Sequence, residues 1–244
     1  MTPLVISHRG AWWPDRDREN TLSALAAAFA AGQGVEVDVR QFRGDTARLV
    51  LSHDPLPEGS EWTDGDDGSL PSWDAFLDLA YQTDPSLPIL INVKEPGTET
   101  RLAWDLQAWG LQTRAYLFDF ELCGADPLKA KATAPEVPCL VRVSDQAGTG
   151  VAPDVVPTLP HWARGAWIDP WISCEWATAE LIALWQTLGP VFIVAPDLHG
   201  RPFDFKLLDR WRGADGVCTD LGSLVGPWLA GQPELFPANV WWGE

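Results

Sequence analysis

Short apolar runs, each of the length of a buried strand, alternate with helix-like segments along the chain. The runs lie at 4–8, 35–40, 48–53, 89–94, 114–119, 138–143, 165–169, 191–196 and 216–219, and helical patterns lie at 21–31, 73–81, 98–109, 127–133, 177–188, 204–212 and 221–230. Strands separated by helices pair in parallel through right-handed crossovers. About eight such units favour a single (β/α)8 TIM barrel that spans residues 1–244. No Gly-rich nucleotide-binding motif follows a strand, which argues against an open doubly wound sheet.

The charge of the chain limits its partners. The formal net charge is -17, with 17 Lys and Arg residues against 34 Asp and Glu residues. Nucleic acids and anionic membrane surfaces are bound by clusters of Lys and Arg, so neither partner is expected. A small phosphate ester is compatible with this charge, since a cation and a few Arg or Lys side chains can reverse the potential locally. We therefore expect a small-molecule ligand.

The cysteines and the N-terminal residues indicate a cytoplasmic protein. The four cysteines are widely spaced and form no C-x-x-C motif: Cys123, Cys139, Cys174 and Cys218. This spacing is typical of reduced thiols rather than of disulfides or zinc ligands. The N-terminal residues enter a strand pattern at once, so we expect no signal peptide. No apolar run approaches the length of about 18 residues that indicates a membrane-spanning helix.

Three of the strand patterns carry ionisable residues near their ends. His8 closes the first pattern and His53 closes the third, while the second carries Glu36 and Asp38. In a barrel the C-terminal ends of the parallel strands meet on one face, where catalytic residues are found. An imidazole with a pKa near ~6.5 can take up or release a proton near neutral pH. We therefore expect His8 and His53 to perform acid–base chemistry.

Glu36 and Asp38 are two residues apart on a strand, so their side chains point to the same side. The neighbouring valines are expected to face the helices, which leaves both carboxylates inside the barrel. Two like charges there repel each other unless a cation or basic groups lie between them. Salt bridges to Arg40 or Arg43 are the weaker alternative, because Arg40 lies further out along the strand. Oxygen ligands of this kind suit Mg²⁺ or Ca²⁺ better than zinc.

Five short motifs occur in an order that resembles the glycerophosphodiester phosphodiesterase family. They are His8-Arg9-Gly10, Glu19-Asn20-Thr21, Glu36-x-Asp38, Ser52-His53-Asp54 and the segment Asp215-Gly216-Val217-Cys218-Thr219-Asp220. Together they cover both ends of the expected barrel, with the spacing of that family. The middle of the chain is more similar to a divergent bacterial branch, with Asn92-x-Lys94 on the third strand and Leu198-His199-Gly200-Arg201 near the seventh.

The resemblance implies a role for each of these residues. It implies a divalent metal at Glu36 and Asp38, with Asn92 at a position that is usually a metal-binding Glu. Asparagine keeps a carbonyl ligand but removes a charge. Arg9 and Lys94 are implied to bind phosphate; the alternatives are an ion pair of Arg9 with Glu19 and a salt bridge from Lys94 to Glu36 or Asp38.

The resemblance also implies the division of labour between the two histidines. One of them activates the attacking oxygen and the other protonates the departing alkoxide. The sequence does not assign which histidine takes which role. The attacking group is implied to be a neighbouring hydroxyl of the substrate, which gives a cyclic phosphate first.

His199 and Arg201 are expected to contact the part of the substrate beyond the scissile phosphate. Barrel enzymes often bind phosphate in the loops after strands seven and eight, and Gly200 permits a tight turn that would aim both side chains inward. A helix cap and a surface ion pair with Asp197 or Asp204 are the alternative interpretation. Further residues near strand ends are candidates for either the site or local structure: Asp119, Asp169, Asp220, Trp12, Trp13, Trp167 and Trp171.

The sequence therefore predicts a metal-dependent phosphodiester hydrolase that acts on a glycerol- or sugar-phosphate diester. The alternative is a barrel that binds a phosphorylated ligand without turnover. Asn92 is the reason to keep that alternative, whereas the presence of both histidines argues against it. A metal-dependent amidohydrolase is set aside, because the first strand has no His-x-His.

Overall fold

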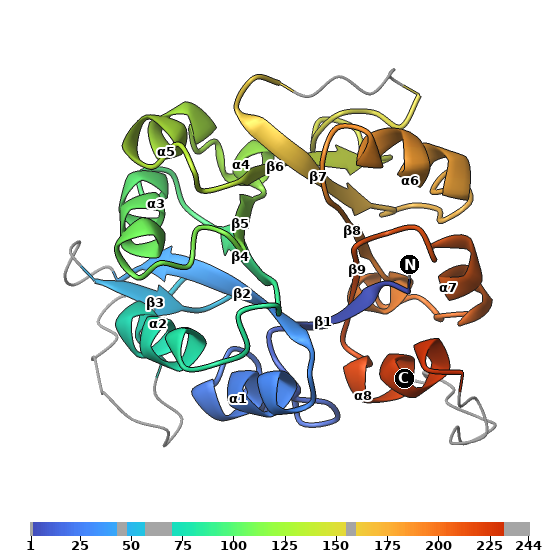
Figure 1. Cartoon of the computed structure of the whole chain (residues 1–244), viewed down its shortest axis with the longest axis horizontal. Helices are drawn as coiled ribbons and strands as arrows, with labels where there is room; N and C mark the ends of the chain where they lie inside the picture. Colours follow the sequence, from blue (N-terminus) through green and yellow to red (C-terminus); the bar gives the residue numbers. More distant parts are fainter. Residues whose placement is uncertain (1, 43–47, 57–69, 155–159, 232–244) are drawn as a thin grey trace.

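Eight parallel strands close into a barrel in the computed structural model, which describes residues 2–42, 48–56, 70–154 and 160–231 (Figure 1). Each strand pairs with the next along the chain, and the pairing of β9 with β1 and of β1 with β2 completes the circle. The barrel strands are β1 (Leu4–His8), β2 (Gly34–Gln41), β4 (Ile89–Val93), β5 (Ala115–Phe118), β6 (Cys139–Ser144), β7 (Ala163–Asp169), β8 (Val191–Val194) and β9 (Gly216–Thr219). The predicted (β/α)8 fold is confirmed.

The helices form a ring outside the barrel (Figure 1). They are α1 (Leu22–Ala30), α2 (Trp73–Tyr81), α3 (Glu99–Ala108), α4 (Phe120–Cys123), α5 (Pro127–Thr133), α6 (Ala179–Gln186), α7 (Lys206–Arg210) and α8 (Gly222–Leu229), with 3-10 turns η1 (Arg16–Arg18) and η2 (Pro196–His199). Side-chain oxygens of Thr21, Ser72 and Thr178 accept hydrogen bonds from the first turns of α1, α2 and α6. These caps satisfy backbone N–H groups that a helix start leaves free. None of the helices in the described ranges combines the length and hydrophobicity of a membrane span.

The run at 48–53 is not a barrel strand. Its central part forms β3 (Leu49–Leu51), which pairs antiparallel with β2 and lies outside the closed circle. The expectation of parallel pairing is wrong here because the link from β2 to β3, residues 42–48, is too short for a crossover. The chain turns back on itself, and the residues after β3 return toward the barrel mouth. His53 therefore reaches the mouth by a hairpin.

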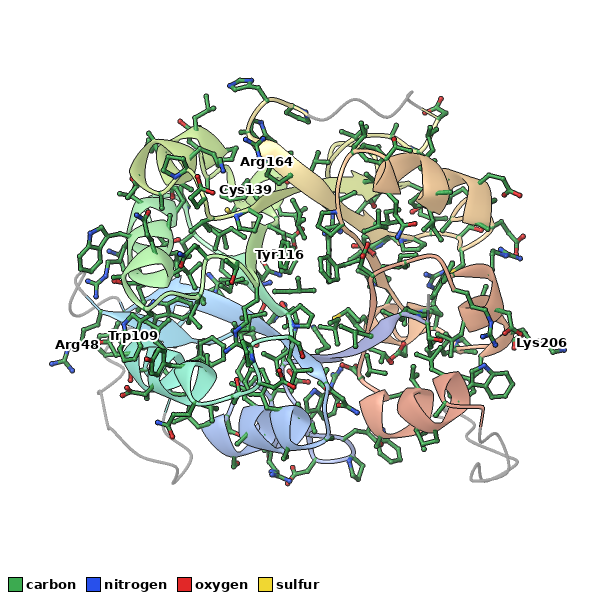
Figure 2. The ribbon with its side chains drawn as sticks, viewed as in Figure 1. Arg48, Trp109, Tyr116, Cys139, Arg164 and Lys206 are labelled. Carbon is green, nitrogen blue, oxygen red and sulfur yellow. The ribbon has the colours of Figure 1, made fainter. Side chains whose placement is uncertain are left out.

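The two faces of the barrel strands have different partners. Val35, Val37 and Val39 are fully buried in a cluster with apolar side chains of α1, α2 and α3. A second cluster, with Phe118 and Trp167 in ring contact at 4.2 Å, fills the barrel interior. Figure 2 shows Tyr116 of β5 lying toward the interior, where it packs on this second cluster. The apolar filling leaves the polar side chains at the C-terminal end of the barrel.

Gly10 allows α1 to lie close to the end of β1. Its φ is +89°, and a Cβ atom at this position would lie 2.7 Å from the carbonyl carbon of Ala24 and 2.8 Å from the nitrogen of Leu25. The backbone N–H of Ala11 also donates to the carbonyl of Ala24, at 2.9 Å. The glycine of the His-Arg-Gly motif is thus required by helix packing and by a left-handed backbone.

We expect Gly10→Ala to lower the stability of the fold more than Gly110→Ala. Both glycines have positive φ, but nothing lies within 4 Å of a Cβ at Gly110. Gly110→Ala should cost only the left-handed penalty of roughly 1–2 kcal/mol, whereas Gly10→Ala should cost about 1–3 kcal/mol more through overpacking. Chemical denaturation of the two variants measures the difference. Equal losses would contradict the packing role of Gly10.

Candidate active site

A cavity of about 250 Å³, with many ionisable side chains in its lining, lies at the C-terminal end of the barrel. Most of its lining divides into two sets of side chains on different strands, and Leu122, Trp167, Val194 and Leu198 supply the rest. The first set comes from β1, β2, β4 and the segment after β3: His8, Arg9, Glu36, His53, Asn92 and Lys94. The second set comes from β5, β6, β7 and the loops that follow β7 and β8: Asp119, Arg142, Asp169, Trp171 and His199. Every residue predicted for the site except Asp38 and Arg201 lines this cavity.

Asp38 is enclosed by cations. Its carboxylate lies 2.8 Å from Nε of Arg9 and 3.0 Å from Nζ of Lys94, and it accepts a hydrogen bond from Asn20 Nδ2 at 3.1 Å. The two contacts with cations are ion pairs without hydrogen-bond geometry. Burial would raise the pKa of Asp38, but the charges of Lys94 and Arg9 hold it well below its usual range. Arg9 also pairs with Glu19, so both ion pairs that the sequence left as alternatives are present.

Glu36 is buried but poorly paired. Its Oε2 atom has no hydrogen-bond partner among the described residues and lies 3.8 Å from Nε2 of His8. Burial and the negative charge of Asp38 raise the pKa of Glu36 to about 7. The two carboxylates predicted to face the interior do so, and the ion pairs that hold them involve Arg9, Lys94 and His8. Arg40 instead donates to the carbonyl of His53 and pairs with Glu95.

His8 is fixed by Asp220. The distance between His8 Nδ1 and Asp220 Oδ1 is 2.6 Å, and Trp12 Nε1 donates to the carbonyl of His8 at 2.8 Å. Burial lowers the pKa of His8, but the hydrogen bond to Asp220 and the charges of Asp220 and Glu36 outweigh it, so the pKa is raised. Asp220 is therefore a site residue and not simply a helix cap.

His53 has the opposite electrostatic environment. Its side chain is 46% exposed, and its Nδ1 lies 2.8 Å from Asp54 Oδ1. Partial burial and the positive charges of Arg9 and Lys94 lower its pKa. The backbone of His53 is held by Arg40, whose Nε and Nη2 donate to the His53 carbonyl at 2.9 and 2.7 Å. The two histidines thus face one cavity with pKa values displaced in opposite directions.

The oxygen atoms available to a metal lie on Glu36, Asp38 and Asn92. Glu36 Oε2, Asp38 Oδ1 and Asn92 Oδ1 are buried without a hydrogen-bond partner, and Asp38 and Asn92 are paired in register on β2 and β4. Within the described ranges, no three His, Cys, Asp or Glu side chains form a group that could hold a metal. A site here needs the Asn92 amide oxygen. This all-oxygen set fits a hard divalent cation, with Asp38 shared with Lys94.

The second set of lining residues is a chain of ion pairs. Arg142 Nη1 donates to Asp119 Oδ1 at 2.7 Å, and Nη2 pairs with Asp169. His199 Nε2 lies 2.6 Å from the other oxygen of Asp169, and the ring of Trp171 lies 4.2 Å from the His199 ring. Asp119 and Asp169, which were candidates for helix caps, are therefore members of the site.

Arg201 does not accompany His199 into the cavity. It donates to the carbonyl of Ile172 at 3.1 Å and to that of Pro170, and it lines a separate cavity. The expectation that the turn aims both side chains inward is not met, because Gly200, with φ +65°, ends the 3-10 turn and sends the next residue away. The predicted ion pair with Asp197 or Asp204 is also not observed in the described structure.

Three residues of the site carry a left-handed backbone although none is glycine. They are Arg9 at φ 55°, Asn20 at φ 58° and Asp119 at φ 64°. Asn20 also accepts a hydrogen bond from the Asp38 backbone at 3.3 Å. Such conformations cost of order 1–3 kcal/mol each and gather at functional sites. Arg9 and Asp119 line the cavity, and Asn20 contacts Asp38.

Three residues around the cavity were not predicted from the sequence as members of the site: Arg142, Asn20 and Asp197. Arg142 lies between Val141 and Val143, so the strand pattern places its charged side chain on the interior face. This pattern could have marked Arg142 as a site residue. Asn20 belonged to a matching motif, but only the fold shows that it binds Asp38. Asp197 accepts hydrogen bonds from Thr219 Oγ1 at 2.8 Å and from the Asp220 backbone at 2.7 Å, which supports the partner of His8.

Comparison with solved structures supports the fold. The chain is similar to a glycerophosphodiester phosphodiesterase from Parabacteroides distasonis, with a TM-score of 0.68 and 16% identity over 95% of this chain and 98% of that one. It is also similar to a glycerophosphodiester phosphodiesterase from Agrobacterium tumefaciens, with a TM-score of 0.64 and 19% identity over 91% and 98% of the two chains.

A barrel of different activity matches less well. The tryptophan synthase alpha subunit of Campylobacter jejuni gives a TM-score of 0.51 and 14% identity over 96% of both chains. No family model and no curated protein matches the sequence. At these identities the structural similarity establishes the barrel fold, and any activity has to be argued from the site.

We expect Asp197→Asn to stabilise the protein at pH 7.5 but not at pH 4. Burial and the charge of Asp220 raise the pKa of Asp197 to about 6, above its unfolded value. A carboxyl group whose pKa is higher in the folded state than in the unfolded state makes its most favourable contribution to the free energy of unfolding below the unfolded pKa. That contribution is lost as the pH rises through the folded pKa, because ionisation then favours the unfolded state. Asparagine does not ionise and should gain about 1–2 kcal/mol at pH 7.5.

Thermal unfolding of wild type and variant at the two pH values tests this prediction. The exposed Asp154→Asn is the matched control and should change neither value. An Asp197→Asn effect of the same size at both pH values would show that ionisation of Asp197 does not limit stability.

Proposed function

We propose that the chain is a metal-dependent phosphodiester hydrolase that acts on a glycerol- or sugar-phosphate diester. The observation that carries the proposal is the arrangement of His8 and His53 on one cavity, with a raised and a lowered pKa beside the cations Arg9 and Lys94. Acid–base catalysis requires one group that holds a proton and one that accepts it. The structural similarity to glycerophosphodiester phosphodiesterases supports the same reaction class.

The opposite pKa shifts support one division of the two roles. His53 is kept neutral and would accept the proton of the attacking hydroxyl as that oxygen bonds to phosphorus. His8, which Asp220 holds in its protonated form, would give its proton to the departing alkoxide as the P–O bond breaks. When the attacking hydroxyl belongs to the substrate, the first product is a cyclic phosphate, which water then opens with the roles reversed.

The phosphodiester carries a negative charge into an acidic protein. Arg9 and Lys94 supply fixed positive charge at the cavity, although each also neutralises Asp38. Glu36, Asp38 and Asn92 would hold Mg²⁺ or Ca²⁺, and such an ion supplies charge stabilisation to the phosphoryl oxygens when it is bound. The raised pKa of Glu36 arises from its burial and from the negative charge of Asp38, and a bound cation would offset both effects.

His8→Ala and His53→Ala should each lower kcat by about 10²–10⁴, the usual contribution of a general acid or base. Hydrolysis of glycerophosphoglycerol in the presence of Mg²⁺ or Ca²⁺ measures the loss, because this substrate has both a neighbouring hydroxyl and an alkoxide leaving group. His161→Ala is the control, because His161 is exposed and lies outside the cavity.

The outcomes separate the two candidate functions. Circular dichroism should show that both variants keep the fold. Wild-type activity in either variant would remove that histidine from the mechanism. Binding of the diesters by wild type without turnover would favour the non-catalytic phospho-ligand-binding barrel.

Asn92→Asp should strengthen the binding of Mg²⁺ or Ca²⁺ by on the order of tenfold, because a charged ligand replaces a neutral one. Asn92→Leu has a similar volume but no oxygen and should weaken binding. Isothermal titration calorimetry gives the affinities without reference to activity. Identical affinities for wild type and both variants would place the cation elsewhere.

A further inference from the structure

We propose that the side of the cavity formed by Asp119, Arg142, Asp169, Trp171 and His199 binds the alcohol moiety of the diester and selects an uncharged polyol. We call this set the polyol wall. The inference rests on the proposed function, since it names the substrate class of the same site. The polyol wall lines the cavity that also holds His8 and His53, so a diester at those histidines would extend its alcohol group toward it.

The polyol wall is built of charges that the fold alone does not need. Asp119, Arg142 and Asp169 are only 4%, 2% and 2% exposed, and they come from three neighbouring strand ends. Buried ion pairs of this kind rarely add stability relative to apolar residues, because desolvation offsets the attraction. Arg142 Nε is moreover buried without a hydrogen-bond partner in the described structure. An interior position that keeps such groups is best explained by a polar ligand.

Trp171 is held in place by contacts on both sides of its loop. Asp145 accepts hydrogen bonds from the backbone of Ile172 at 2.9 Å and of Ser173 at 2.8 Å. Arg201 donates to the carbonyl of Ile172 at 3.1 Å and to that of Pro170. The indole stays 41% exposed at the cavity and packs on His199. Arg201 therefore positions an open aromatic surface without touching the ligand.

The composition of the polyol wall favours one ligand chemistry. Carboxylates, a guanidinium and an imidazole accept and donate hydrogen bonds to hydroxyl groups, and an indole face covers the C–H face of a sugar or cyclitol ring. An acyl chain would offer no hydrogen bonds to the polar side chains of the polyol wall, which would then be paired only with one another. Trp171 would also attract a quaternary ammonium, but both carboxylates here are paired with Arg142, whose charge opposes a second cation. A second anionic group on the substrate would be repelled by the carboxylates of Asp119 and Asp169.

The test compares kcat/KM for glycerophosphoinositol, glycerophosphocholine and bis-p-nitrophenyl phosphate. Wild type should prefer the inositol diester over the choline diester by about tenfold or more, as expected for one or two extra hydrogen bonds. Trp171→Ala and His199→Ala should each reduce this preference toward unity. Trp104→Ala on α3 is the control, since Trp104 is an exposed indole away from the cavity, and it should keep the preference.

A binding measurement keeps the inference independent of turnover. In His53→Ala, calorimetry should give a dissociation constant for glycerophosphoinositol about tenfold below that for glycerophosphocholine, and Trp171→Ala in that background should abolish the difference. Equal use and equal binding of the two diesters would overturn the polyol wall while leaving the phosphodiesterase proposal intact. Selective binding of the inositol diester without any turnover would support the polyol wall and overturn the proposed reaction.

Discussion

The buried carboxylate of Asp38 is the group around which the barrel mouth is assembled. A full negative charge in an interior is costly unless cations and hydrogen-bond donors surround it. Arg9 from the end of β1, Lys94 from the segment after β4 and Asn20 from the segment before α1 all converge on it. This one group therefore ties together three parts of the chain that are distant in sequence. Glu36, its neighbour on β2, is paired more loosely, with its Oε2 atom 3.8 Å from Nε2 of His8.

The periodic parts of the fold could be predicted from the sequence. The alternation of apolar runs and helical segments is local information, and so is the parity that turns Glu36 and Asp38 inward while the valines face the helices. The placement of β3 was not predicted correctly, because parallel or antiparallel pairing depends on whether the link can cross over the sheet. The same hairpin brings His53 to the mouth, so a residue that lines the cavity was predicted for a partly wrong structural reason.

The site was predictable where motifs marked the ends of strands and not where contacts join distant segments. His8, Glu36, Asn92 and Lys94 line the cavity as expected. Arg201 does not, because one left-handed glycine determines where the next side chain goes, and a sequence does not show that dihedral angle. The links from Asp197 to Asp220 and from Arg142 to two strands arise only when the barrel closes, so no local pattern reports them.

The left-handed residues at the mouth connect the stability of the barrel to the chemistry of its site. Arg9, Asn20 and Asp119 each have an unfavourable backbone conformation. Together these conformations lower the free energy of unfolding by a few kcal/mol, out of a total that is typically about 5–15 kcal/mol. Every strand of the closed barrel is paired on both sides. The packing of the barrel holds those three residues in their unfavourable conformations. Changes deep in the apolar filling can therefore impair the site without touching it. A weakened barrel would relax first where its backbone is most strained, and that is where residues of the candidate site are held.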